Sequence, residues 1–257
     1  MSPLSSYLDF AVQTAYEAGR LTLGYFDRGI LPDFKEDDTP VTIADREAET
    51  LIRKRIASRY PDHAVVGEEF GHSDNISDRR WFIDPIDGTK AFMCGVPLFS
   101  VLLGLEIEGR ICVGVAYLPA LGEMIYAADG LGCFCNGRLV RVREVEDLDR
   151  AIMAFTDPVT FETYHRSQAY QRLQKACWHR AGWSDAFGHI LVATGRIDLM
   201  LDPIMSAWDC GPFPVILREA GGYFGDWSGH ETIYGNEALS TTQKLLSKVL
   251  EIVRSSD

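Results

Sequence analysis

The sequence contains no long apolar run, and only a minority of its charges are positive. No stretch reaches the roughly eighteen apolar residues of a membrane-spanning helix. The opening segment MSPLSSYLDF has neither the basic end nor the apolar run of a secretion signal. Lys and Arg number 25 against 37 Asp and Glu, for a formal net charge of -12, whereas nucleic-acid binders use cations to contact phosphates. We therefore expect a cytoplasmic protein whose partners include neither a membrane nor a nucleic acid.

Cysteine does not occur in a zinc-binding pattern. The six cysteines lie in apolar surroundings, and no Cys or His pair accompanies the segment CFC at zinc spacing. We interpret CFC as one strand of a hairpin. With no secretion signal, the sequence predicts free thiols in a reducing compartment.

The apolar pattern predicts a mixed sheet packed with helices. With 257 residues, 46% of them apolar, the chain can form one large domain or two modest ones. Helical periodicity covers residues 4–28, 42–60, 161–175, 185–194, 208–220 and a last segment from 243. Strand patterns cover residues 63–67, 79–84, 98–118, 123–137, 177–180, 197–201 and 238–242. The charge-rich segment at 141–151 separates an α+β half, 1–150, from an α/β half, 151–257.

Acidic residues follow predicted strands or lie near predicted helix starts. Glu68 follows VVG, Asp84 follows WFI, and Asp87 comes three residues later. Asp45 lies at the start of the second helix, and Asp209 lies in AWDCG. Ligands of open sheets bind beyond the carboxyl ends of strands. Carboxylates crowded in one pocket need cations, and Mg²⁺ takes oxygen ligands. This spacing predicts a magnesium site built by three segments.

The segment DPIDGTKAF adds the features of an anion site. Pro85 keeps Asp84 extended, Gly88 permits a tight turn, and Thr89 begins a short predicted helix. Backbone amides at a helix start bind phosphate. A metal cluster beside such a helix is typical of metal-assisted phosphoester hydrolysis. Taken alone, the segment is equally consistent with an acidic turn before a capped helix.

Four motifs occur in a fixed order and are distributed over much of the chain. VTIAD, GEE, DPIDGT and WDCGPFPVILREAGG follow one another as in the inositol monophosphatase family, which the chain strongly resembles. Members are magnesium-dependent, lithium-sensitive phosphatases acting on small phosphate monoesters. The resemblance implies an α/β fold of alternating α-β-α-β-α layers, a homodimer, and two or three Mg²⁺ ions.

The resemblance also implies a role for each matching residue. The metal ligands would be Glu68, Asp84, the carbonyl of Ile86, Asp87 and Asp209. Asp84 would bridge two ions. The amides of Gly88 and Thr89 would hold the phosphate. Thr89 and Asp45 would orient the attacking water, and Glu68 would belong to the catalytic group as well as to the metal site. Asp87 and Asp209 would also contact the substrate.

Two segments favour one branch of this superfamily. Inositol-specific members read DGTTNF where this chain reads DGTKAF, with Lys90. The segment GWSDAFGHILVATGRIDLMLDP resembles the pattern GDxYGHxLVATGRxDxMxDP of histidinol-phosphate phosphatases. Ser184 and Phe187 depart from it, standing where that pattern has glycine and tyrosine. We expect histidinol phosphate as substrate, with inositol 1-phosphate or another sugar phosphate as the alternative. A non-catalytic binder is disfavoured because every acid the chemistry needs is present.

Two further acids are candidates for contacting the organic half of the substrate. Histidinol phosphate carries an ammonium and an imidazole, which Asp185 and Asp202 could attract. The alternative for Asp185 is plain helix N-capping, and for Asp202 an exposed acid before a turn. His189 lies one helical turn after Asp185, and we interpret it as a core residue.

Overall fold

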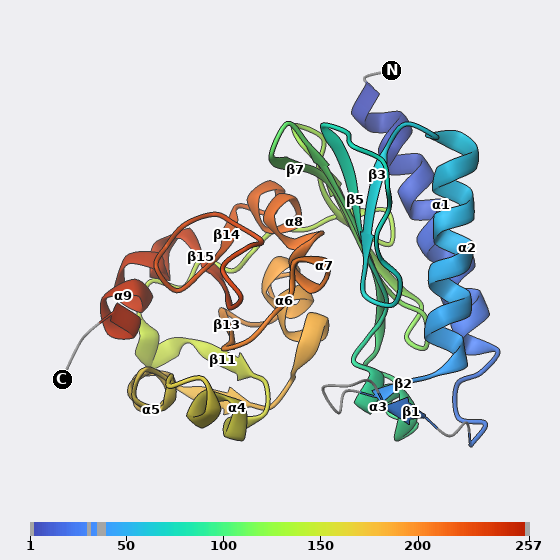
Figure 1. Ribbon diagram of the computed structural model, residues 1–257. Coiled ribbons are helices and arrows are strands. Elements are labelled where there is room, and N and C mark those ends of the chain that lie inside the picture. Colours follow the sequence, from blue (N-terminus) through green and yellow to red (C-terminus); the bar gives the residue numbers. More distant parts are fainter. Residues whose placement is uncertain (1–2, 30–31, 35–39, 255–257) are drawn as a thin grey trace.

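Helices and sheets alternate through the molecule in the order helix, sheet, helix, sheet, helix (Figure 1). The computed structural model describes residues 3–29, 32–34 and 40–254. Three apolar clusters fill the spaces between successive layers. The layered α-β-α-β-α architecture implied by the resemblance is confirmed. Within the described residues, none of the helices combines the length and apolarity needed to cross a bilayer.

The first layer consists of α1 (Pro3–Leu23) and α2 (Ile43–Arg59). The prediction that the first helix runs to residue 28 is wrong. The chain turns after Leu23, where the amides of Tyr25 and Phe26 both donate to the carbonyl of Thr22. The Phe26 ring then packs 4.9 Å from that of Phe99. The residues of the last predicted helical turn, 24–28, thus bend away from the helix, and Phe26 packs among other aromatic rings.

The second layer is an eight-stranded sheet in the order β10-β9-β8-β7-β6-β5-β3-β4. Only β3 and β5 are parallel neighbours; all other pairs are antiparallel. Its strands are β3 (Ala64–Gly67), β4 (Gly71–His72), β5 (Arg79–Asp87), β6 (Ser100–Ile107), β7 (Arg110–Leu118), β8 (Glu123–Ala128), β9 (Gly132–Cys135) and β10 (Arg138–Leu139). Trp81 and Ile83 pack with α1 and α2, whereas Phe82 packs with the central helices. The CFC segment lies in β9 as predicted, and its thiols are free.

The central layer contains α6 (Asp185–Ala193), α7 (Ala207–Cys210) and α8 (Phe213–Glu219). The prediction of one helix over residues 208–220 is wrong, because Gly211 and Pro212 separate α7 from α8. There the backbone crosses directly over the eight-stranded sheet. A Cβ atom at Gly104 would collide with the Gly211 backbone, and one at Gly114 with that of Pro212. This close approach places α7 against β5.

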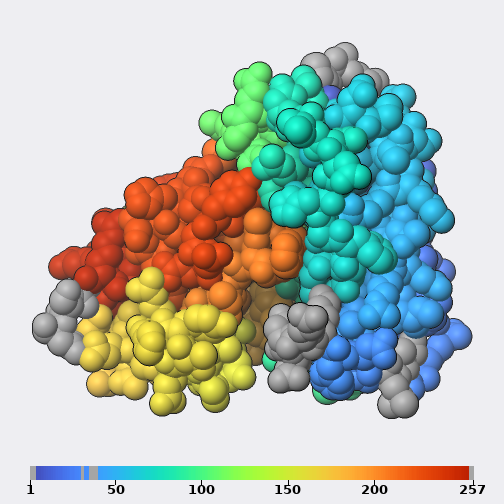
Figure 2. Space-filling model, in the orientation of Figure 1, coloured from blue at the N-terminus to red at the C-terminus, as the bar shows by residue number. Residues whose placement is uncertain are grey.

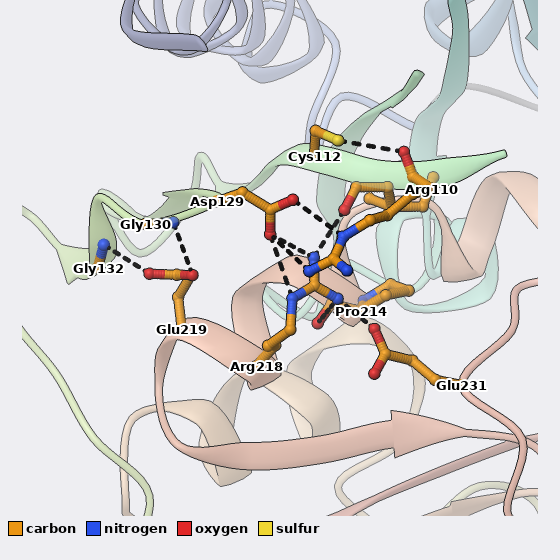
Figure 3. Close-up of polar contacts among 10 residues, drawn as sticks. Arg110, Cys112, Asp129, Gly130, Gly132, Pro214, Arg218, Glu219 and Glu231 are labelled. Carbon is orange, nitrogen blue, oxygen red and sulfur yellow. Dashed lines mark hydrogen bonds and ion pairs between the residues drawn. The ribbon is translucent and has the colours of Figure 1, made fainter. Parts of the chain in front are cut away.

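A polar network fixes α8 to the same sheet (Figure 3). Arg218 donates to Oδ1 of Asp129 at 2.6 Å. The neighbouring Glu219 accepts hydrogen bonds from the amides of Gly130 at 2.9 Å and Gly132 at 2.7 Å. The segment REAGG therefore anchors α8, and with it the preceding α7, to the turn between β8 and β9.

The fourth layer is a five-stranded sheet in the order β12-β11-β13-β15-β14. Its strands are β11 (Ile152–Phe155), β12 (His179–Ala181), β13 (Leu199–Asp202), β14 (Gly222–Gly225) and β15 (Ala238–Thr242). β11 is parallel to β12 and β13, and the other pairs are antiparallel. β11 and β14 were not predicted, and the strand predicted over 177–180 begins two residues before β12 and ends one residue before the end of β12.

The outer layer contains α5 (Ser167–Ala176) and α9 (Gln243–Arg254), with α4 (Pro158–Thr163) beside them. The predicted helix over 161–175 is therefore two helices. They are separated around His165, whose φ of 57° lies in the left-handed region. Along the chain, the strands of the eight-stranded sheet precede the short helix η1 (Leu148–Arg150), and those of the five-stranded sheet follow it. The division into domains 1–150 and 151–257 stays a prediction.

On the face seen in Figure 2, the teal surface of the eight-stranded sheet and the orange surface of the central layer are in contact. A small two-stranded sheet of β1 (Asp33–Phe34) and β2 (Pro40–Val41) lies near α3 (Thr89–Met93) at one end of the molecule (Figure 1).

Candidate active site

A cavity of ≈ 600 Å³ lies where the two sheets and the central helices meet. It receives residues from the segment after β3, from α3, from the start of α6, and from the ends of β11 and β13. Its acidic lining residues are Glu68, Asp87, Asp157, Asp185, Asp202 and Asp209. Gly88, Thr89 and Lys90 line the same cavity. The structure therefore brings five of the predicted acids, all of those just named except Asp157, and the predicted phosphate turn to a single place.

A β-bulge in β5 lies between Asp84 and Asp87, two of the predicted metal ligands. β5 continues to Asp87, so the prediction that this strand ends at Asp84 is wrong. Asp84 pairs with Leu102 and Asp87 with Ser100, so three steps along β5 oppose two steps along β6. In a regular strand, residues three apart point to opposite faces. The extra residue lets Asp84 and Asp87 approach the same site.

The turn after β5 is organised by its own side chains. Asp84 Oδ1 accepts a hydrogen bond from the amide of Ile86 at 3.0 Å. Thr89 Oγ1 donates to the carbonyl of Ile86 at 3.0 Å. Gly88 has a φ of 81°, and a Cβ there would lie 3.4 Å from Oδ2 of Asp185. Glycine thus permits the left-handed backbone of this turn, and Asp185 lies at contact distance from it.

Asp45 lies in the first turn of α2. Its Oδ2 accepts from the amide of Thr42 at 2.8 Å and from the Thr42 hydroxyl at 2.6 Å. Its Oδ1 is buried and has no hydrogen-bond partner among the described residues. Burial raises the pKa of Asp45 to about 6, and the charge of Glu68 adds to the increase.

Asp209 approaches from the opposite side, on α7. Its Oδ2 accepts from the amide of Ser206 at 2.8 Å. Burial raises the pKa of Asp209 to about 7, and the charge of Glu68 contributes. Since Glu68 influences both Asp45 and Asp209, segments from both sides of the eight-stranded sheet meet at this residue.

Asp185 and Asp202 form the wall of the cavity beyond the phosphate turn. Asp185 is the first residue of α6, the N-cap position is Ser184, and the Ser184 hydroxyl donates to Asp185 Oδ2 at 3.1 Å. The alternative that Asp185 caps the helix is therefore wrong. Asp202 ends β13 and is 5% exposed, so the alternative of an exposed acid is also wrong.

The backbone of Asp185 has a φ of 58°, which is uncommon outside glycine. The next amide, that of Ala186, donates to Asp87 Oδ2 at 2.9 Å. This contact ties the start of α6 to β5. His189 is fully buried, 2.7 Å from the hydroxyl of Ser240, and burial lowers its pKa to about 3. The prediction of a core histidine is confirmed.

The carboxylates of the site destabilise one another's charged forms. Burial raises the pKa of Asp84 well above its usual range, and the charges of Glu68, Asp87, Asp209 and Asp45 raise it further. Burial likewise raises the pKa of Asp87 and Asp202, and Asp185 adds to both effects. A bound cation relieves this repulsion.

The donor set suits Mg²⁺, because it consists of carboxylate and carbonyl oxygens with a buried, unpartnered oxygen at Asp45. Across 3–29, 32–34 and 40–254, no group of three or more acidic, His or Cys side chains is placed to hold a metal ion on its own. Mg²⁺ usually keeps waters and takes one or two carboxylates together with substrate phosphates. An open arrangement of acids therefore fits this ion.

The sequence did not indicate Asp157 or Glu49 as residues of the site, and it indicated Lys90 without assigning it a role. Lys90 contributes a cation to the cavity, and its charge opposes the burial that raises the pKa of Asp185. Asp157 lines the outer part of the cavity after β11. Asp157 follows a strand, which is the pattern that indicated Glu68. It was not recognised because β11 itself was not predicted. Glu49 is buried near Glu68, inside a helix where that pattern does not apply.

Comparison with known proteins places this site in a family. The sequence profile of the inositol monophosphatase family matches residues 4–257. The chain belongs to the inositol monophosphatase family. It is therefore a phosphatase, a hydrolase of phosphoric monoesters, in a family whose members generally depend on Mg²⁺.

Individual relatives of the family cover nearly the whole chain. A protein of Chlorobaculum parvum named histidinol-phosphatase is 41% identical over 244 residues, which is 95% of this chain and 94% of the relative. One of Aquifex aeolicus, named fructose-1,6-bisphosphatase/inositol-1-monophosphatase, is 33% identical, covering 93% of this chain and 94% of its own. The solved structure of an inositol monophosphatase from Zymomonas mobilis matches with a TM-score of 0.89 and 27% identity, covering 99% of this chain and 100% of its own.

Proposed function

We propose that this phosphatase hydrolyses L-histidinol phosphate to L-histidinol and phosphate. The observation that carries the proposal is the pair of buried acids, Asp185 and Asp202, in the cavity wall beyond the phosphate turn. Burial raises the pKa of both, so a cation beside them is favoured. The organic half of histidinol phosphate supplies that cation. The 41% identical relative named histidinol-phosphatase supports the same choice.

The proposed metal site takes two or three Mg²⁺ ions. Glu68, Asp84, the carbonyl of Ile86, Asp87 and Asp209 would hold these ions. Bound Mg²⁺ supplies positive charge that neutralises the acids and polarises the phosphoryl oxygens. The Ile86 carbonyl accepts from Thr89 Oγ1, and its second lone pair leaves room for a metal.

The proposed catalytic residues act on water and phosphate. The amides of Gly88 and Thr89, at the start of α3, bind the phosphate. The Thr89 hydroxyl donates a hydrogen bond to the Ile86 carbonyl. Its oxygen lone pairs can therefore accept a hydrogen bond from the attacking water. Asp45 and Thr89 orient that water, and Glu68 completes the catalytic group. The unpartnered Asp45 Oδ1 supports its part in this assignment.

Replacing Thr89 with Ala is expected to lower kcat by roughly a hundred- to ten-thousand-fold, the usual contribution of a positioned proton acceptor. The Mg²⁺ concentration for half-maximal activity should change little, because Thr89 supplies no metal-ligating side chain in this proposal. Steady-state kinetics across a Mg²⁺ titration measure both quantities. Thr89→Ser, which keeps the hydroxyl, is the matched control and should retain most activity. A Thr89→Ala enzyme near the wild-type rate would remove the residue from the water-orienting group.

Specificity must come from contacts to the organic half of the substrate, since metal and phosphate contacts are common to all monoesters. Four acids that line the cavity, Asp185, Asp202, Asp87 and Asp209, are the proposed contacts to that half. A buried carboxylate paired with the substrate ammonium discriminates against inositol phosphate, because a hydroxyl cannot neutralise that charge.

Asp185→Asn tests this proposal directly. Losing one partner of a desolvated charge pair costs about 2–5 kcal/mol, which corresponds to roughly 30- to 5,000-fold in kcat/KM. We expect the loss for histidinol phosphate, mainly in KM, and little change for a small uncharged phosphate monoester. Parallel kinetics on both substrates measure the difference. An equal loss on both would show that Asp185 supports the fold of the site and does not select the substrate.

A second candidate function is hydrolysis of inositol or sugar phosphates, which the name of the Aquifex relative favours. Lithium inhibition, a cytoplasmic location and a homodimer remain predictions from the resemblance. For this chain, competition of Li⁺ for a magnesium position is expected with either substrate.

A further inference from the structure

The buried carboxylate of Glu49 lies inside the turn that carries Glu68, and the proposed function gives Glu49 no role. Glu49, on α2, has a fully buried side chain. Its Oε2 accepts from the amide of Glu69 at 2.8 Å, and its Oε1 from the amide of Phe70 at 3.3 Å. Each carboxylate oxygen thus binds one amide of the turn between β3 and β4.

Arg53 completes this arrangement one helical turn later. Its Nε lies 2.7 Å from Oε1 of Glu49, and its guanidinium donates to the carbonyl of Gly71. The same guanidinium lies 6.0 Å from the centre of the Phe70 ring. The ion pair of Glu49 and Arg53 therefore satisfies both donors and an acceptor of the turn. These partners offset part of the cost of desolvating the buried Glu49 carboxylate.

The fit between the helix and the turn depends on Gly67. A Cβ atom at this position would collide with Oε1 of Glu49. The last residue of β3 thus lacks a side chain where the carboxylate enters the turn. Glycine occurs at this position of the segment GEE because of this close approach, and not because of its backbone conformation.

The turn fixes Glu68 relative to the metal-binding segment of β5. The amide of Glu68 donates to the carbonyl of Ile83 at 3.2 Å, and Ile83 directly precedes Asp84. The next two amides are held by Glu49. Three successive amides thus determine where the Glu68 backbone lies beside Asp84, and Glu49 accounts for two of them.

We infer that Glu49, braced by Arg53, is a positioning residue that sets Glu68 for Mg²⁺ binding. This inference rests on the proposed magnesium site. Asp45 lies one helical turn before Glu49 on the same helix. The helix α2 therefore fixes the water-orienting acid and the turn that carries Glu68 as one rigid unit.

Glu49→Gln tests the inference, because glutamine has the same shape but offers only one acceptor oxygen for the two amides. Groups that support a metal ligand typically contribute about 10- to 100-fold in metal affinity. We expect Mg²⁺ affinity, measured by calorimetry without substrate, to fall by about tenfold or more. The increase in Tm caused by Mg²⁺ should shrink correspondingly. The control is Glu47→Gln, the same substitution at an exposed position of α2, which should bind Mg²⁺ as the wild type does.

The outcomes separate positioning from plain structural support. A Glu49→Gln protein that loses stability in chelator but binds Mg²⁺ with wild-type affinity would overturn the inference. If Glu49→Gln does not fold, Arg53→Gln decides, since the Arg53 side chain is 20% exposed and its loss leaves Glu49 in place. A smaller loss of Mg²⁺ affinity in Arg53→Gln supports the inference, and unchanged affinity overturns it. If the wild type itself binds no Mg²⁺, the proposed metal site fails instead.

Discussion

Asp84→Asn is expected to abolish turnover while leaving the fold intact. Asp84 is the acid whose charge is opposed by four neighbouring carboxylates, and it would bridge two ions. The amide of Asn cannot supply the negative charge that a bridging ligand contributes. Because even residues that only support metal ligands contribute about 10- to 100-fold, we expect kcat to fall by more than about a hundredfold.

The same substitution should leave the metal-free protein at least as stable as the wild type. Asn Oδ1 can still accept the hydrogen bond from the Ile86 amide, and the repulsion among the buried acids is reduced. Thermal unfolding in chelator measures this stability. Asp78→Asn, at an exposed acid just before β5, is the matched control. If Asp84→Asn retained wild-type turnover, Asp84 could not be a metal bridge.

Removal of divalent cations is expected to eliminate activity reversibly. The proposed site has oxygen donors only, so chelation should remove Mg²⁺ without destroying a structural element, and added Mg²⁺ should restore the rate. An ion that binds only the native state stabilises it by about 2.7 kcal/mol at a concentration one hundred times its Kd. The Tm should therefore rise with Mg²⁺. Phosphate release in chelator, and again after adding excess Mg²⁺, measures the effect. Full activity in chelator would contradict the proposed site.

The acids of the site could be predicted because their local sequence context is informative. Glu68 follows a short apolar strand, and the segment DPIDGT contains a proline and a glycine that constrain the backbone. These features depend on neighbouring residues alone. The bulge between Asp84 and Asp87 could not be predicted in this way, because it depends on the register of β5 against β6.

Burial of the substrate-facing acids also depends on tertiary structure. Asp202 ends a strand, as its sequence indicated, but tertiary packing, including that of α6 against β13, makes it buried and not an exposed acid before a turn. The predicted helix over 208–220 contained its own breaker, Pro212. Nothing local to that segment showed that Gly211 and Pro212 would cross the sheet at two glycines of neighbouring strands.

Glu49 illustrates a further limit. A single glutamate within a helix is typical of a solvated face. Its different role follows from Gly67, eighteen positions later, and from a turn in which the amides of Glu69 and Phe70 donate to its carboxylate. Long-range contacts of this kind cannot be inferred from the spacing of residues on one helix.

The most direct test of the account compares two substrates of the purified enzyme at saturating Mg²⁺. Phosphate release gives kcat/KM for L-histidinol phosphate and for inositol 1-phosphate. We predict that histidinol phosphate is preferred by about 30-fold or more, the lower range expected for one desolvated charge pair. Equal values, or a preference for inositol 1-phosphate, would contradict the assignment of Asp185 and Asp202 as the acids that recognise a substrate cation.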